Sequence, residues 1–177
     1  MKGNGFPPVI TENQNQQNKR VMKKVFSFAA LVLISTASLF AQDATAVRKK
    51  QFNLEKNGLA IQGYDPVAYF KQNKAVQGSK DMAVSYQGAL YYFSSAENKA
   101  EFLKSPAKYE PEYGGWCAYA LGAKGEKVEI DPETFKIIDG KLFLFYNKYL
   151  NNTLKTWNKD EANLHSKADA NWQKTFH

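Results

Sequence analysis

The one cysteine of the chain lies in a segment with unusual chemistry. Cys117 follows Gly114, Gly115 and Trp116, and Tyr119 comes two residues later. Paired glycines permit positive φ angles or a close approach of the backbone to a ligand. Aromatic rings on both sides of a thiol can form the flat apolar walls of a pocket. These five residues are therefore the candidate ligand-binding residues.

His165 is the candidate partner of Cys117 by elimination, because His177 is the last residue of the chain. A thiol and an imidazole together suit a copper or zinc ion, or nucleophilic catalysis. The separation of the two residues in sequence neither supports nor excludes a contact between them. A third member of a catalytic triad cannot be identified, so the pattern favours a non-enzymatic site.

Structural interpretations of the same residues stay open. A free cysteine commonly behaves as a small buried hydrophobe, and His165 lies in a predicted helix where it can be a surface residue. Asp65, Asp131 and Asp139 each stand at a turn beside proline or glycine, where capping of the backbone accounts for them. Phosphate-binding glycine loops, a nucleophile elbow and dinucleotide motifs are absent from the sequence.

The composition limits the class of protein. The aromatic content of 14% in 177 residues supplies enough large side chains for one domain with a substantial core, which excludes a mainly disordered chain. One cysteine excludes a disulfide framework within the chain. The net charge of +7 is concentrated at the N-terminus, since residues 1–41 hold five cations and one anion. The remaining lysines are scattered, so we expect no nucleic-acid partner.

Residues 22–41 are predicted to be a signal peptide. Lys23 and Lys24 precede an apolar run over residues 25–40, and the small residue Ala41 follows that run. A short cationic stretch, a short apolar run and small residues before a cleavage point are typical of secretory signals. We therefore expect an exported protein, periplasmic or secreted, without a stable membrane anchor after cleavage.

The alternative for the same run is a transmembrane anchor. Ser35, Thr36 and Ser38 interrupt the run, and it is shorter than the roughly 20 apolar residues that a spanning helix needs. Cleavage is therefore favoured, with Gln42 as the new N-terminus. Residues 1–21 are polar and lie upstream of a second methionine, which indicates an over-extended start.

The mature chain is predicted to be an α+β domain at residues 58–177, after a segment at residues 42–57 that is interpreted as a flexible arm or, for residues 42–56, as a short helix. Two β-hairpins form its small antiparallel sheet, and short helices pack on that sheet. The predicted elements are a helix capped by Asp65, a hairpin at 82–86 and 89–93, a helix after Ser94, a hairpin at 128–138 and 142–146, and C-terminal helices at 148–157 and 159–172. Ser94 and Glu97 are interpreted as the capping box of the second helix.

Several motifs in this order resemble the YHS domain family. They are Gly63-Tyr64-Asp65-Pro66-Val67-Ala68-Tyr69-Phe70, Tyr92-Phe93-Ser94-Ser95-Ala96-Glu97-Asn98, Tyr113-Gly114-Gly115-Trp116-Cys117, and Ala168-Asp169-Ala170-Asn171-Trp172. The later motifs look like those of exported, single-domain bacterial members, and the resemblance extends from about Gly58 to the C-terminus. It implies a core like that of a degenerate treble clef, followed by the C-terminal helices.

Metal-handling members of the family carry three cysteines, and this chain departs from that pattern at each of them. Ala68, Ser94 and Asn98 stand at the matching positions. Alanine offers no ligand atom, and a hydroxyl or an amide is a poor ligand for a soft ion. The family's metal site is therefore predicted to be inactive, with Ser94 serving as a helix cap.

Two functions follow from these observations. The first is an exported YHS binding module for a metal ion, copper or zinc, or for a small ligand near Cys117, with Cys117 and His165 as the metal ligands. The second is a metal-free structural or protein-interaction domain. A cysteine-dependent enzyme is a distant third.

Overall fold

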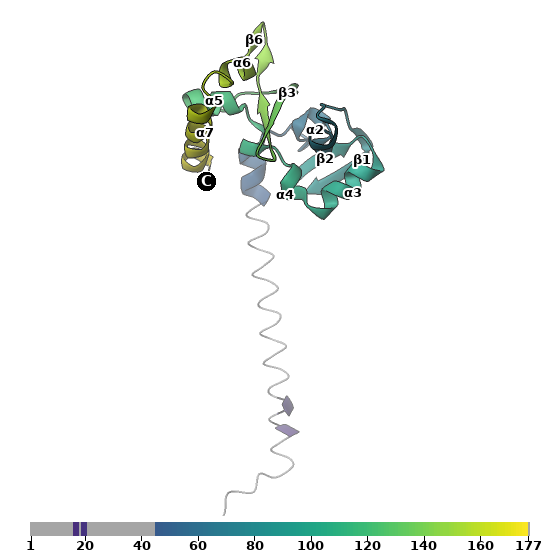
Figure 1. The fold of residues 1–177 in the computed structure, drawn as a ribbon. Coiled ribbons are helices and arrows are strands. Elements are labelled where there is room, and N and C mark those ends of the chain that lie inside the picture. The colour runs from purple at the N-terminus through teal and green to yellow at the C-terminus, as the bar shows by residue number, and fades with distance from the viewer. Residues whose placement is uncertain (1–15, 18, 21–44, 177) are drawn as a thin grey trace, which may run out of the picture. The chain divides into compact units, whose positions relative to one another are not determined.

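The computed structural model describes residues 16–17, 19–20 and 45–176. The predicted signal peptide at 22–41 lies outside the described residues, as does most of the predicted over-extended start at 1–21. The backbone divides into two compact units, Met1–Asp43 and Ala44–His177. The second unit, drawn from blue to yellow in Figure 1, contains both hydrophobic clusters. Within the described residues, no helix has the length and apolar character to cross a membrane.

The first half of the unit is a hairpin covered by short helices. Strands β1 (Ser79–Tyr86) and β2 (Ala89–Phe93) pair antiparallel. Gly88 in the connecting turn has φ +86°, as a tight hairpin turn requires. The associated helical segments are η1 (Ile61–Gly63), α2 (Pro66–Gln72), α3 (Ala96–Lys104) and α4 (Pro106–Tyr109). The predicted hairpin at 82–86 and 89–93 is thus confirmed, with β1 three residues longer at its start.

The core of this half forms where β2 meets α3. Alternate residues of β2 point inward, because successive side chains of a strand face opposite sides. The ring of Phe102 on α3 lies 5.0 Å from that of Tyr91 and 5.1 Å from that of Phe93. All three side chains have no exposed surface, so they fix α3 on the hairpin.

The second half is built around strand β4 (Lys141–Phe145), which pairs antiparallel with β3 (Asp131–Ile138). The other elements are η2 (Glu112–Gly115), α5 (Ala118–Lys124), β5 (Asn147–Lys148), β6 (Asn151–Asn152), α6 (Thr153–Trp157) and α7 (Glu161–Phe176). Leu142 and Leu144 belong to the hydrophobic cluster shared with the first half. Phe143 and Phe145 belong to a second cluster, with Trp157. Strand β4 is therefore buried on both faces.

The α+β class is confirmed, but the expected single sheet is not. In the described chain the hairpins form separate two-stranded sheets, β1–β2 and β3–β4, beside a very short β5–β6 pair. Pro111 and Cys117 form isolated parallel bridges to Leu142 and Leu144 of β4. Leu142 and Leu144 also pair with β3, so these bridges use the edge of β4 that faces away from β3, and β2 does not pair with that edge.

The segment predicted as a flexible arm is packed on the domain. Residues 45–51 are helical, and Arg48 in this helix forms an ion pair with Glu110. The amide of Asn53 donates a hydrogen bond of 2.9 Å to the carbonyl of Gly114. The ring of Phe52 lies 6.5 Å from that of Trp172. Of the two interpretations of this segment, residues 45–51 adopt the short helix and not a loose arm. Contacts with Glu110, Gly114 and Trp172 hold the helix and the residues that follow it.

Candidate functional site

Two of the three positions that hold cysteines in metal-handling relatives meet at one buried carboxylate. The Asp65 side chain has no exposed surface. Its Oδ2 accepts hydrogen bonds from Ser94 Oγ at 2.6 Å and from Asn98 Nδ2 at 2.8 Å. Asp65, Ser94 and Asn98 are called the carboxylate cluster from here on. They come from the start of α2, the end of β2 and the first turn of α3.

Backbone amides complete the hydrogen bonding of this carboxylate. The amide of Ser94 donates to Oδ2 at 2.8 Å. Oδ1 accepts from the amides of Val67 at 2.9 Å and Ala68 at 3.3 Å, so Asp65 is the N-cap of α2 as predicted. The third cysteine position, Ala68, thus contributes its backbone amide. Five donors occupy the two oxygens, which offer about four lone-pair sites between them.

Ser94 does not cap α3, contrary to the prediction. The N-cap is Ser95, whose hydroxyl accepts a hydrogen bond of 3.1 Å from the amide of Asn98. The hydroxyl of Ser94 is instead held by Asp65. The two serines are adjacent. Because the hydroxyl of Ser94 donates to Asp65, the N-cap of α3 is Ser95.

A soft metal ion does not fit the carboxylate cluster. Thiolates are absent from it, and every oxygen lone pair of Asp65 is already used by a protein donor. Throughout the described residues, no buried side-chain nitrogen or oxygen lacks a hydrogen-bond partner. The same part of the chain has no group of three or more histidine, cysteine, aspartate or glutamate residues placed to hold a metal. Hydrogen bonds to Asp65 hold the three segments of the cluster together.

Cys117 is a wholly buried residue at the start of α5. Its sulfur accepts a hydrogen bond from the amide of Tyr146 at 3.3 Å and lies 3.5 Å from the hydroxyl of Thr153. The backbone of Cys117 forms a bridge to Leu144. These contacts describe a core thiol that joins α5 to the end of β4 and the start of α6.

We expect the native thiol of Cys117 to react with a small alkylating reagent at least about a hundredfold more slowly than an exposed thiol. Mass spectrometry after timed labelling measures this rate. The thiol introduced by Ala123→Cys, at an exposed position of the same helix, is the reference within one molecule. Equal labelling of the two thiols before denaturation would show that Cys117 is an accessible site.

His165 contacts the opposite face of β4. Its ring packs 4.9 Å from that of Phe143 and 5.9 Å from that of Trp157, which belong to the second cluster. Its Nε2 lies 3.8 Å from an oxygen of Asp169. Cys117 belongs to the first cluster, so the described contacts do not bring the predicted metal pair together.

The two glycines before Cys117 allow another segment of the chain to approach their backbone closely. Gly114 has φ +59°, and a Cβ atom there would lie 2.7 Å from the ring of Phe52. The carbonyl of Gly115 accepts a hydrogen bond from the side chain of Asn53 at 3.2 Å. The close backbone approach that the glycine pair predicts is therefore present. The segment that approaches is residues 52–53.

The two aromatic candidates are half-buried. The ring nitrogen of Trp116 donates to the carbonyl of Gln51 at 2.6 Å, and the ammonium of Lys127 lies 5.4 Å from the Trp116 ring. Tyr119 packs against both hydrophobic clusters. Trp116 thus helps to hold the 45–51 helix, and Tyr119 contributes to the core.

A groove lies beside Gly114, between the 45–51 helix, η2 and α7. It encloses about 400 Å³, within the usual range for small-ligand sites. The rings of Phe52, Tyr113 and Trp172 line it, and the ring centroids of Tyr113 and Trp172 are 6.2 Å apart. We call this the aromatic groove. Sequence reasoning found Gly114 in its wall but missed Phe52 and Trp172, because they are far apart in sequence.

The charged groups that line the aromatic groove are engaged with protein partners. Glu110 pairs with Arg48 and accepts a hydrogen bond of 2.6 Å from the hydroxyl of Tyr91. Burial, with the charge and hydrogen bond of Glu110, raises the pKa of the Tyr91 phenol. Glu112 pairs with Lys141 at 3.3 Å. The groove therefore presents aromatic rings and neutralised charges.

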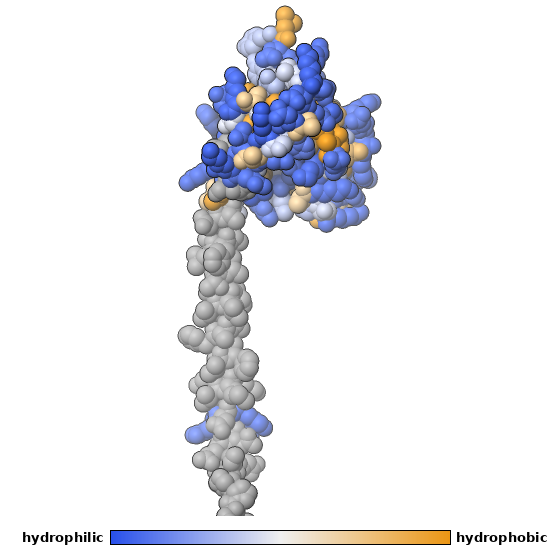
Figure 2. Space-filling model, turned by 60° about the vertical axis from the view of Figure 1, so that its left-hand side comes forward, coloured by the Kyte–Doolittle hydropathy of each residue, from blue (hydrophilic) through white to orange (hydrophobic). Residues whose placement is uncertain are grey.

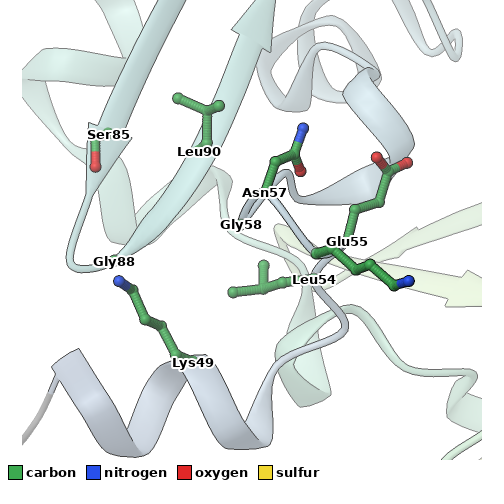
Figure 3. A pocket seen from close by; sticks show the side chains of 9 residues that line it. Lys49, Leu54, Glu55, Asn57, Gly58, Ser85, Gly88 and Leu90 are labelled. Atoms are coloured by element: carbon green, nitrogen blue, oxygen red, sulfur yellow. The ribbon is translucent and has the colours of Figure 1, made fainter.

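A second hollow, of about 500 Å³, lies on the other side of the 45–51 helix (Figure 3). Lys49 extends from that helix toward Gly88 in the turn between β1 and β2. Lys56 and Glu55 also line the hollow, so its walls carry charges of both signs. Leu54 and Leu90 supply its apolar surface. None of the residues that line it is a nucleophilic thiol or an imidazole.

Comparison with known proteins identifies one family. Residues 67–113 match the family model described as YHS domain. This stretch runs from the first turn of α2 to η2 and includes two members of the carboxylate cluster, Ser94 and Asn98. No curated protein and no solved structure matches the chain. The chain therefore contains a YHS domain, as the sequence motifs predict.

Proposed function

We propose that this YHS-domain chain is an exported binding module that folds without a metal ion and takes a small ligand in the aromatic groove. The proposal for export rests on the signal-like pattern of residues 22–41. The proposal of a metal-free fold is supported by the carboxylate cluster. Asp65 accepts five hydrogen bonds from the segments that bear Ala68, Ser94 and Asn98, the positions where the family resemblance implies cysteines in metal-handling members.

The aromatic groove is favoured over Cys117 as the ligand site. The sulfur of Cys117 is buried and hydrogen-bonded, whereas the groove is open and lined by three aromatic rings. Its acidic residues Glu110 and Glu112 are already in ion pairs. Burial of a charged ligand against neutralised groups would be costly. The ligand class that fits is therefore a small, uncharged molecule with a flat apolar part.

The metal-free fold is tested by chelation and titration of the purified chain. The melting temperature is expected to be the same with and without a strong chelator, because hydrogen bonds replace metal ligation at the carboxylate cluster. Calorimetric titration with zinc or with copper(I) under reducing conditions should show no stoichiometric binding. A drop of several degrees on chelation would contradict the proposal, as would binding that Cys117→Ser abolishes.

The ligand class is tested with indole as an uncharged probe and benzoate as an anionic one. Indole is expected to shift the ring N–H resonance of Trp172 in NMR spectra in a saturable way, and more strongly than benzoate does. Phe52→Ala removes one wall of the groove and should weaken indole binding about fivefold or more. Leu103→Ala, at an exposed site on α3, is the matched control. Equal shifts in both variants would exclude the groove.

A further inference from the structure

The turn between β5 and β6 exposes two large side chains. Tyr149 is 93% exposed and Leu150 is fully exposed. In Figure 2 a hydrophobic projection stands at the end of the domain where Figure 1 labels β6. Large apolar side chains at the tip of a projection add nothing to the packing of the core. Both side chains are therefore accessible to another surface.

The backbone of this turn is strained by the same two residues. Tyr149 has φ +53° and Leu150 has φ +65°, and both are therefore left-handed. A hairpin turn of this kind ordinarily carries Asn-Gly, which adopts these angles with little strain. Bulky side chains in this region are outliers, and such strain concentrates at functional sites. The turn thus combines strain with exposure, and neither stabilises the fold.

Three lysines lie beside the exposed turn and on the segment that follows it, before Asp160. Residues 147–159 contain Lys148, Lys155 and Lys159 and no aspartate or glutamate. All three lysines are exposed. Asn152 at the end of β6 caps α6, because its side-chain oxygen accepts a hydrogen bond of 3.1 Å from the amide of Leu154. This cap connects the turn directly to the helix that bears Lys155.

We propose that the Tyr149–Leu150 turn docks reversibly on an anionic lipid surface. A convex tip with two apolar side chains suits the boundary between headgroups and acyl chains, where tyrosine is also favoured. The lysines next to the tip would lie at the level of the anionic headgroups. Only two apolar side chains would enter the membrane, so the attachment is reversible. The turn is separate from the aromatic groove, and the proposal does not depend on a ligand there.

The test is sedimentation of the chain from Gln42 with lipid vesicles. This form contains the whole compact unit Ala44–His177 with both clusters. Binding is expected to vesicles with about a third phosphatidylglycerol in phosphatidylcholine, and to weaken with added salt. Lys148→Gln should weaken it about fivefold. Lys80→Gln, at an exposed position of β1, should leave it unchanged.

The decisive variant is Tyr149→Asn with Leu150→Gly. This pair suits the observed turn angles, so its melting temperature should equal or exceed that of the unchanged chain. Binding to the anionic vesicles should nevertheless fall at least about tenfold. Leu103→Ser removes an exposed apolar side chain elsewhere and is the control. The proposal is overturned if the unchanged chain does not sediment with anionic vesicles, or if the Asn-Gly variant binds as well as it does.

Discussion

Replacement of Asp65 by alanine is expected to lower the free energy of unfolding by about 3–5 kcal/mol. The carboxylate accepts hydrogen bonds from five donors and has no exposed surface. Its removal leaves the Ser94 hydroxyl and the Asn98 amide without their acceptor in the interior. The N-cap of α2 is lost at the same time. Urea denaturation followed by circular dichroism measures the change.

Controls for this prediction separate the buried carboxylate from a general effect of lost charge. Asp81→Ala, at an exposed position of β1, should change the free energy of unfolding by no more than about 0.5 kcal/mol. Ser94→Ala removes one of the five donors and should cost about 1–2 kcal/mol. A loss below 1 kcal/mol for Asp65→Ala would mean that the carboxylate cluster does not hold α2, β2 and α3 together.

Local patterns predicted the parts of the fold that local chemistry decides. The hairpin turns at Gly88 and Gly140 follow from a glycine between alternating apolar residues. The cap at Asp65 follows from a carboxylate before a proline. In each case the residues that form the turn or the cap are neighbours in sequence, so the local sequence is sufficient to predict it.

The remaining features depend on partners that are distant in sequence. The choice between Ser94 and Ser95 as helix cap is made by Asp65, about thirty residues earlier. The space beside Gly114 is filled by Phe52. Ser94 lies just before the N-cap of α3 and Asn98 lies in the first turn of that helix, so the two residues are close along the chain. The identity of their common acceptor, Asp65, needed the three-dimensional fold.

Gly122→Ala is expected to lower the free energy of unfolding by about 2–3 kcal/mol, although alanine is the better helix former. A Cβ atom at Gly122 would lie 2.3 Å from the carbonyl oxygen of Leu164, so α5 and α7 must move apart. The contacted atom is backbone and cannot rotate away. Neighbouring contacts resist the shift, including the hydrogen bond of 2.7 Å from Asn171 to the carbonyl of Leu121.

The adjacent residue provides the matched control for helix propensity. Ala123 is exposed on α5, and Ala123→Gly should cost about 1 kcal/mol, the ordinary difference between the two residues in a helix. If propensity alone decided the outcome, Gly122→Ala would stabilise the protein by a similar amount. Stabilisation by this substitution in a urea denaturation series would therefore exclude the close crossing of α5 and α7.

The same substitution connects the packing of α7 to the proposed ligand site. Trp172 lies on α7 and forms one wall of the aromatic groove. A displacement of α7 by the alanine at position 122 moves this ring relative to Phe52 and Tyr113. We therefore expect Gly122→Ala to weaken indole binding as well as stability, whereas Ala123→Gly should lower stability alone. Such a difference in indole binding between the two variants arises only if the shape of the groove depends on the close crossing of α5 and α7.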